Sequence, residues 1–150
     1  MKTKLPLFVA ALAVALFGVG CSSLDKGLVA YYPFDEGEGA TVTDQSGNGH
    51  NGVIKGAKWV DGVSGHALEF GKNWVNLGSF GDYSNKVTFT GWFKTSSQNV
   101  WMDILAGPSG EDVLFGLLHD HPSWGMQSNQ YFILHSKTSV IDGKWHFVAG

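Results

Sequence analysis

Residues 86–94 read KVTFTGWFK and show the clearest strand pattern of the chain. Successive side chains of a β-strand point to opposite faces of the sheet. Val87, Phe89 and Phe93 would therefore share one face, and Trp92 would lie on the other. Trp92 and Trp145 lie in the strongest strand patterns, so we expect both of them in the core.

On both sides of this stretch, short apolar or alternating runs are separated by Gly, Asn, Asp and Ser, a pattern typical of strands joined by turns. No segment sustains helical periodicity. Many short strands without intervening helices favour packed antiparallel sheets, so we expect an all-β fold. The predicted strands are 28–34, 50–54, 57–60, 66–70, 73–77, 86–95, 100–105, 112–119, 130–136 and 144–149.

Residues 1–20 have the order of a secretory signal. Lys2 and Lys4 precede an apolar run over residues 5–16, and small residues lead into Cys21. The run is too short to read as a membrane-spanning helix. A buried N-terminal helix is the alternative, although no helical pattern downstream would pack against it. We therefore expect a signal at 1–20, a tether at 21–26 and one domain at 27–150.

Cys21 is the only cysteine, so an internal disulfide is excluded. Residues 16–21, LFGVGC, resemble a bacterial lipobox, which implies a lipidated N-terminus at Cys21. Ser22, where Asp would signal retention, resembles the signal for passage to the outer membrane. Because Gly18 stands where an aliphatic residue is usual, ordinary cleavage with a free thiol is the alternative. We expect an exported lipoprotein of the cell envelope, at the outer membrane or cell surface, held to the membrane by its lipid.

Composition excludes two classes of protein. The chain has 43% hydrophobic and 13% aromatic residues, which is not the composition of a disordered chain. It contains no Arg and carries a net charge of −3, which becomes more negative once Lys2 and Lys4 are removed with the signal. Phosphate binding needs clustered Lys or Arg, so nucleic acid is not expected as a partner.

Five segments stand out together: GLVAYYPFDEG at 27–37, DQSGNGHNG at 44–52, GVSGHALEF at 62–70, VTFTGWFK at 87–94 and DGKWHFVA at 142–149. In this order and spacing they resemble a laminin-G-like domain of the concanavalin A-like lectin/glucanase superfamily. The resemblance implies a two-sheet antiparallel jelly-roll sandwich. Members of that family continue beyond the segment that carries Trp145 and His146, so the resemblance also implies that the sandwich is incomplete at its C-terminus.

The turn Asp44-Gln-Ser46-Gly-Asn48-Gly places oxygen-bearing side chains at alternate positions, as the first half of a calcium loop does. Lys55 stands where an EF-hand needs a bidentate Glu, so Asp35 or the adjacent Glu36 would have to complete the shell. We expect a structural calcium ion at this turn. The alternative is a tight turn made by Asx hydrogen bonds, which needs no ion.

Two tryptophans lie near polar connections, Trp101 beside residues 96–99 and Trp124 within residues 122–129. An exposed aromatic ring stacks on the apolar face of a sugar, and Asn129 and Gln130 would hydrogen-bond its hydroxyls. We therefore expect carbohydrate binding at these four residues, and local burial of each ring is the alternative.

The sequence His119-Asp-His121 suggests a transition-metal site, although such a run before Pro122 is more often a solvated turn.

Catalysis is not expected. Glucanases of the same superfamily carry the strand motif Glu-x-Asp-x-x-Glu, because glycoside hydrolysis needs paired carboxylates. The nearest stretch here, WMDILA at 101–106, has Trp101 and Ala106 where the glutamates would be. The sequence therefore predicts a non-catalytic lectin-like module for carbohydrate. The alternatives are an adhesion or structural module for a cell-surface protein, and a non-catalytic fragment of a larger glycan-active enzyme.

Overall fold

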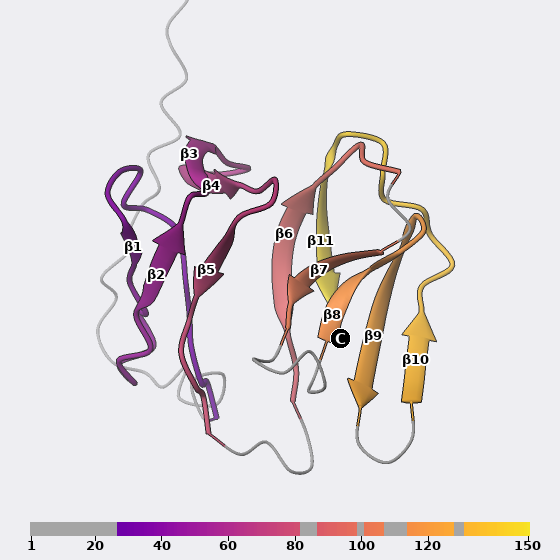
Figure 1. The fold of residues 1–150 in the computed structure, drawn as a ribbon, viewed down its shortest axis with the longest axis horizontal. Helices are drawn as coiled ribbons and strands as arrows, with labels where there is room; N and C mark the ends of the chain where they lie inside the picture. The colour runs from indigo at the N-terminus through magenta and orange to yellow at the C-terminus, as the bar shows by residue number, and fades with distance from the viewer. Residues whose placement is uncertain (1–26, 82–86, 99–100, 107–113, 128–130) are drawn as a thin grey trace, which may run out of the picture.

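The computed structural model describes residues 27–81, 87–98, 101–106, 114–127 and 131–150. These residues form strands and turns but no helix (Figure 1), which confirms the all-β prediction. All pairs of strands are antiparallel. Within the same ranges there is no helix of the length and apolarity needed to cross a bilayer.

The strands lie in two groups (Figure 1). The N-terminal group contains a three-stranded sheet in the order β1-β2-β5 and the hairpin β3-β4; its strands are β1 (Thr41–Val42), β2 (Gly52–Lys55), β3 (Lys58–Asp61), β4 (His66–Glu69) and β5 (Trp74–Asn76). The C-terminal group contains the pair β11-β6 and a four-stranded sheet in the order β10-β9-β8-β7; its strands are β6 (Thr90–Lys94), β7 (Trp101–Leu105), β8 (Leu114–Leu118), β9 (His121–Gln127), β10 (Tyr131–His135) and β11 (Trp145–Ala149).

The strand predicted at 28–34 is wrong. Pro33 has no N–H to donate to a ladder, and Phe34 takes a φ of 59°, outside the β region. The segment bonds to the Asp44 turn instead: the Tyr31 N–H donates to a carboxylate oxygen of Asp44 at 2.9 Å, and its carbonyl accepts from the Gln45 N–H at 2.8 Å. Those bonds satisfy the backbone without a neighbouring strand.

Two strands were missed by the sequence patterns. β1 has two residues, too few for an alternating pattern. β9 covers most of the expected connection at 122–129, because Pro122, Ser123 and Gly125 suggested a turn. The structure places β9 inside the sheet, with β8 on one side and β10 on the other. Pro122 is tolerated near the start of the strand, and its carbonyl accepts from the Ser136 N–H at 2.9 Å.

The core of the C-terminal group lies between the β6-β11 pair and the four-stranded sheet. Phe115 and Leu117 of β8 are both 1% exposed, and Val148 of β11 is buried. Phe89, next to β6, packs against Phe115 with ring centroids 4.7 Å apart. β7 and β8 approach so closely that a Cβ on Gly116 would clash with the Met102 carbonyl oxygen. These contacts hold two antiparallel layers face to face, an arrangement compatible with a β-sandwich.

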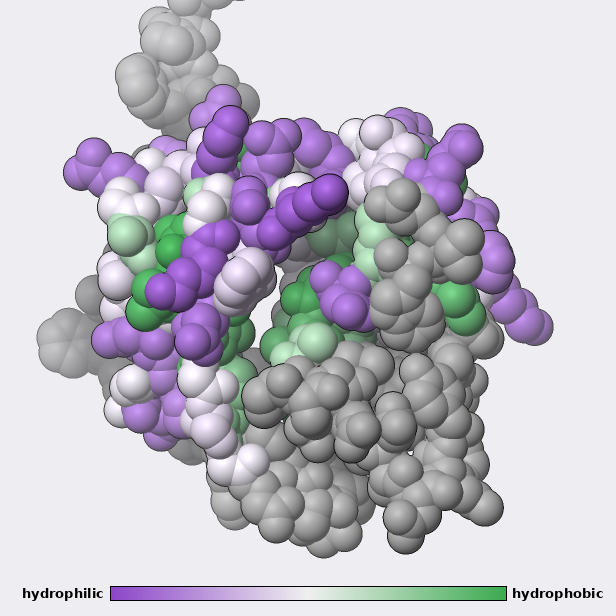
Figure 2. Space-filling view, viewed as in Figure 1, coloured by the Kyte–Doolittle hydropathy of each residue, from purple (hydrophilic) through white to green (hydrophobic). Residues whose placement is uncertain are grey.

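The core prediction for Trp92 is wrong. The face of β6 that packs on the four-stranded sheet is the one carrying Phe93, which alternates with Trp92. Trp92 is 53% exposed and Phe147, its cross-strand partner on β11, is 56% exposed. Trp145 is half-buried. Figure 2 shows the molecule hollowed between the two groups of strands, with hydrophobic residues in the wall of the hollow.

Candidate functional site

Three connections meet at one end of the C-terminal group: residues 95–98 after β6, the turn at 119–120 between β8 and β9, and the segment 136–144 between β10 and β11 (Figure 1). Backbone hydrogen bonds tie them together. The Val140 N–H donates to the Asp120 carbonyl at 3.0 Å, and the Gly143 N–H donates to the Thr95 carbonyl at 2.9 Å. The polar side chains of these connections are therefore held on a fixed backbone.

A shallow depression of about 200 Å³ lies between these connections, lined by Gln98, His119, Asp120 and Ile141. The side chains of His119 and Asp120 are set by a two-residue turn, in which His119 takes a φ of 59°. Such turns between antiparallel strands require positive φ. The depression thus combines an amide, an imidazole and a carboxylate with one aliphatic side chain.

Asp120 is held as a carboxylate. A hydrogen bond from the Ser139 side chain lowers the pKa of Asp120, and its own N–H and the two flanking histidines act in the same direction against burial, which raises it. His121 Nε2 lies 3.1 Å from Asp120 Oδ1. His121 Nδ1 is buried and, within the described ranges, has no hydrogen-bond partner. Asp120 can therefore accept hydrogen bonds from a ligand while ionised.

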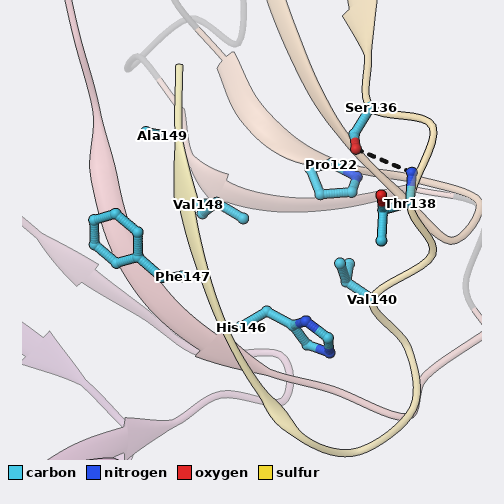
Figure 3. A pocket seen from close by; sticks show the side chains of 8 residues that line it. All are labelled: Pro122, Ser136, Thr138, Val140, His146, Phe147, Val148 and Ala149. Atoms are coloured by element: carbon cyan, nitrogen blue, oxygen red, sulfur yellow. Dashed lines mark hydrogen bonds between the residues drawn. The ribbon is translucent and has the colours of Figure 1, made fainter.

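A second groove, of about 300 Å³, lies between segment 136–144 and β11 (Figure 3). His146 and Val148 point into it from β11, opposite Thr138 and Val140, whereas Phe147 points away to the other side of the strand. Its full lining is Pro122, Ser136, Thr138, Val140, His146, Phe147, Val148 and Ala149.

Among the lining residues that the structure describes, His146 is the one with a titratable side chain. Its Nε2 lies 2.7 Å from Asp142 Oδ1. That bond lowers the pKa of Asp142, with help from the Lys144 N–H at 3.0 Å. The arrangement fixes the imidazole beside the turn that precedes β11.

The two predicted sugar-binding tryptophans lie on different strands. Trp101 is the first residue of β7 and pairs with Leu118, directly before the 119–120 turn. Trp124 lies inside β9, in register with the buried Phe115. Asn129 and Gln130 lie outside the described residues. Of these two tryptophans, Trp101 has its backbone next to the turn that lines the depression.

The Asp44 turn is built on hydrogen bonds. Asp44 is 7% exposed, and Oδ1 accepts from the N–H groups of Tyr31 at 2.9 Å and Ser46 at 2.8 Å. Oδ2 accepts from the Ser46 hydroxyl at 2.9 Å and the His50 N–H at 3.0 Å. Burial alone would raise the pKa of Asp44, but these donors outweigh it and hold the pKa far below its usual value. The turn thus has the geometry of an Asx turn with two donors on each oxygen.

Asp44, Ser46 and Asn48, which were predicted to bind calcium, take part in hydrogen bonds at this turn. A carboxylate has about four acceptor positions, and all those of Asp44 are used. The Asn48 amide donates to the carbonyls of Leu28 and Val29, at 2.8 and 3.0 Å. Asp35 lies instead beside Gly65, whose added Cβ would be 3.3 Å from its Oδ1. Among the residues with described placement, no three His, Cys, Asp or Glu side chains gather as a metal group.

Gln98 and Ile141 were not singled out from the sequence. Gln98 falls in a connection noted for its polarity, and Ile141 precedes an Asp-Gly turn. Both lie in connections at the same end of neighbouring strands, which is the signal that would have found them.

Cys21 lies outside the described residues. Searches with this chain against protein-family models, curated proteins and solved structures found no match.

Proposed function

We propose that this chain is a non-catalytic, lectin-like module that binds carbohydrate in the depression formed by Gln98, His119, Asp120 and Ile141. The observation that carries the proposal is the convergence of three polar side chains and one aliphatic side chain from separate connections. Binding residues concentrate on connections that a rigid sheet positions, because these can vary without disturbing the core.

The chemistry of the depression suits a sugar. The hydroxyl groups of a sugar donate hydrogen bonds to a carboxylate, and they both donate to and accept from an amide. The apolar face of the sugar ring can contact an aliphatic side chain. Asp120 stays ionised because Ser139 donates to it. The depression is shallow and small, so it fits one sugar residue of a glycan rather than a buried cofactor.

The wider proposal follows the sequence resemblance. The two facing layers would belong to a jelly-roll sandwich of the concanavalin A-like type, and residues 1–20 would direct export. Lipid on Cys21 would tether residues 27–150 to the cell envelope, at the outer membrane or surface, where glycans are accessible. The fold alone does not assign a ligand, which is why the depression carries the argument.

A glycan array probed with the purified full chain tests the proposal. We expect binding to one class of glycan, reduced roughly tenfold by Asp120→Asn through loss of a charge-assisted hydrogen bond. Asp61→Asn is the matched control, because Asp61 is exposed on the β3-β4 hairpin in the other group of strands. A chain that binds no glycan, or an Asp120→Asn variant that binds as well as Asp61→Asn, would refute the proposed site.

A further inference from the structure

The outer edge of β6 carries unpaired backbone groups. Among the described strands, β6 pairs with β11 alone. Phe89 and Gly150 exchange both N–H to carbonyl bonds, at 2.8 and 3.0 Å. Hydrogen-bonded and non-hydrogen-bonded pairs alternate along an antiparallel ladder. The pairs Thr90–Ala149, Trp92–Phe147 and Lys94–Trp145 are therefore the non-hydrogen-bonded ones.

Residues of non-hydrogen-bonded pairs direct their backbone N–H and carbonyl away from the partner strand. The backbone groups of Thr90, Trp92 and Lys94 consequently face the side of β6 opposite to β11. Figure 1 shows that β5 lies on that side, across the hollow seen in Figure 2. β5 is itself the last strand of the order β1-β2-β5. Two sheet edges thus border the hollow.

An aromatic face adjoins this edge. Trp92 and Phe147 lie 5.4 Å apart between ring centroids, and each is more than half exposed. Figure 3 shows Phe147 pointing away from the groove of His146. Lys94 lies on the same face, with Nζ 5.1 Å from the ring centroid of Trp145. The edge therefore combines backbone donors and acceptors, apolar rings and one cation.

We propose that the β6 edge binds an extended peptide segment of another protein, which adds a strand beside Thr90, Trp92 and Lys94. Main-chain hydrogen bonds supply affinity in strand addition, and alternate side chains supply specificity. Alternate residues of the peptide would lie on the Trp92 and Phe147 face, so aliphatic side chains are favoured there. Lys94 favours an acidic residue at its end of the peptide.

An extended segment fits this edge better than a glycan or a second folded copy does. A glycan cannot complement a row of alternating N–H and carbonyl groups with strand spacing. A second folded copy would have to bring its own β11 and β5 along with its β6 into the hollow. A single extended strand needs only to lie about 4.8 Å from β6, the usual spacing between neighbouring strands.

The test uses two variants at one position. Thr90→Pro removes an outward N–H and leaves the β6-β11 ladder intact, because proline is tolerated where the N–H faces away from the partner strand. Thr90→Ala keeps the N–H and is the matched control. The probe is a short acetylated and amidated peptide that alternates Val and Thr and ends in Glu, titrated into the ¹⁵N-labelled full chain and followed by NMR.

We expect amide shifts at Thr90, Trp92 and Lys94, and Thr90→Pro should weaken binding about fivefold relative to Thr90→Ala, the loss of one net hydrogen bond. The same peptide with N-methyl groups at alternate residues should not bind. Equal affinities of the two variants, shifts confined to other strands, binding of the N-methylated peptide, or no binding at all would overturn the proposal. Concentration-dependent self-association without peptide binding would assign the edge to a second copy instead.

Discussion

Two phenylalanines on opposite sides of the β6-β11 pair should differ strongly in their contribution to stability. Phe115 is 1% exposed and packs on Phe89. Truncation of a buried phenylalanine to alanine costs about 3–5 kcal/mol, because apolar contacts are lost and a cavity remains. Phe147 is 56% exposed. Full burial of such a side chain is worth about 1.5–3 kcal/mol, so Phe147→Ala should cost about 1 kcal/mol.

Urea unfolding of the purified full chain, followed by circular dichroism, measures both free energies of unfolding. We expect the midpoint for Phe115→Ala to fall well below that for Phe147→Ala, at unchanged dependence on urea concentration. If Phe147→Ala costs as much as Phe115→Ala, Phe147 is buried in the protein in solution. That result would refute the assignment of the Trp92 and Phe147 face as open, and with it the free edge of β6.

Three further predictions concern the N-terminal part of the chain. The folded-state pKa of Asp44 lies below the reference value of 3.8, so the hydrogen bonds of its carboxylate stabilise the fold above pH 3.8 and are lost on acidification below that pH. The melting temperature should therefore fall as the pH drops below 3.8, and it should fall less steeply in Asp44→Asn. Because the acceptor positions of Asp44 are occupied, millimolar calcium should leave the melting temperature unchanged, and a calcium-dependent rise would show that the ion displaces those bonds. Lipidation at Cys21 predicts that Cys21→Ser moves the chain, expressed in a Gram-negative host, out of the membrane fraction, and unchanged partitioning would count against the lipid anchor.

The sequence predicted strand positions well where alternation is strong and failed where tertiary pairing decides. β6 follows directly from the pattern at 86–94, and the face that carries Phe89 and Phe93 is the one that packs on the four-stranded sheet. Trp92 was misplaced because its size suggested the core, although Thr90 and Lys94 on the same face are polar. β9 contains Pro122 and Gly125, which argue for a turn locally. It is a strand because its backbone pairs with β8 on one side and with β10 on the other.

The Asp44 turn shows why a binding site is harder to predict than a strand. Alternating oxygen side chains are equally suited to an ion and to backbone donors, and the sequence of the turn is the same in either case. The difference lies in whether distant N–H groups reach the carboxylate. Tyr31 and His50 supply two of them, and Tyr31 does so because Pro33 and Phe34 keep its segment out of a sheet. The segment misread as a strand and the hydrogen-bonded Asp44 carboxylate therefore belong to one local arrangement.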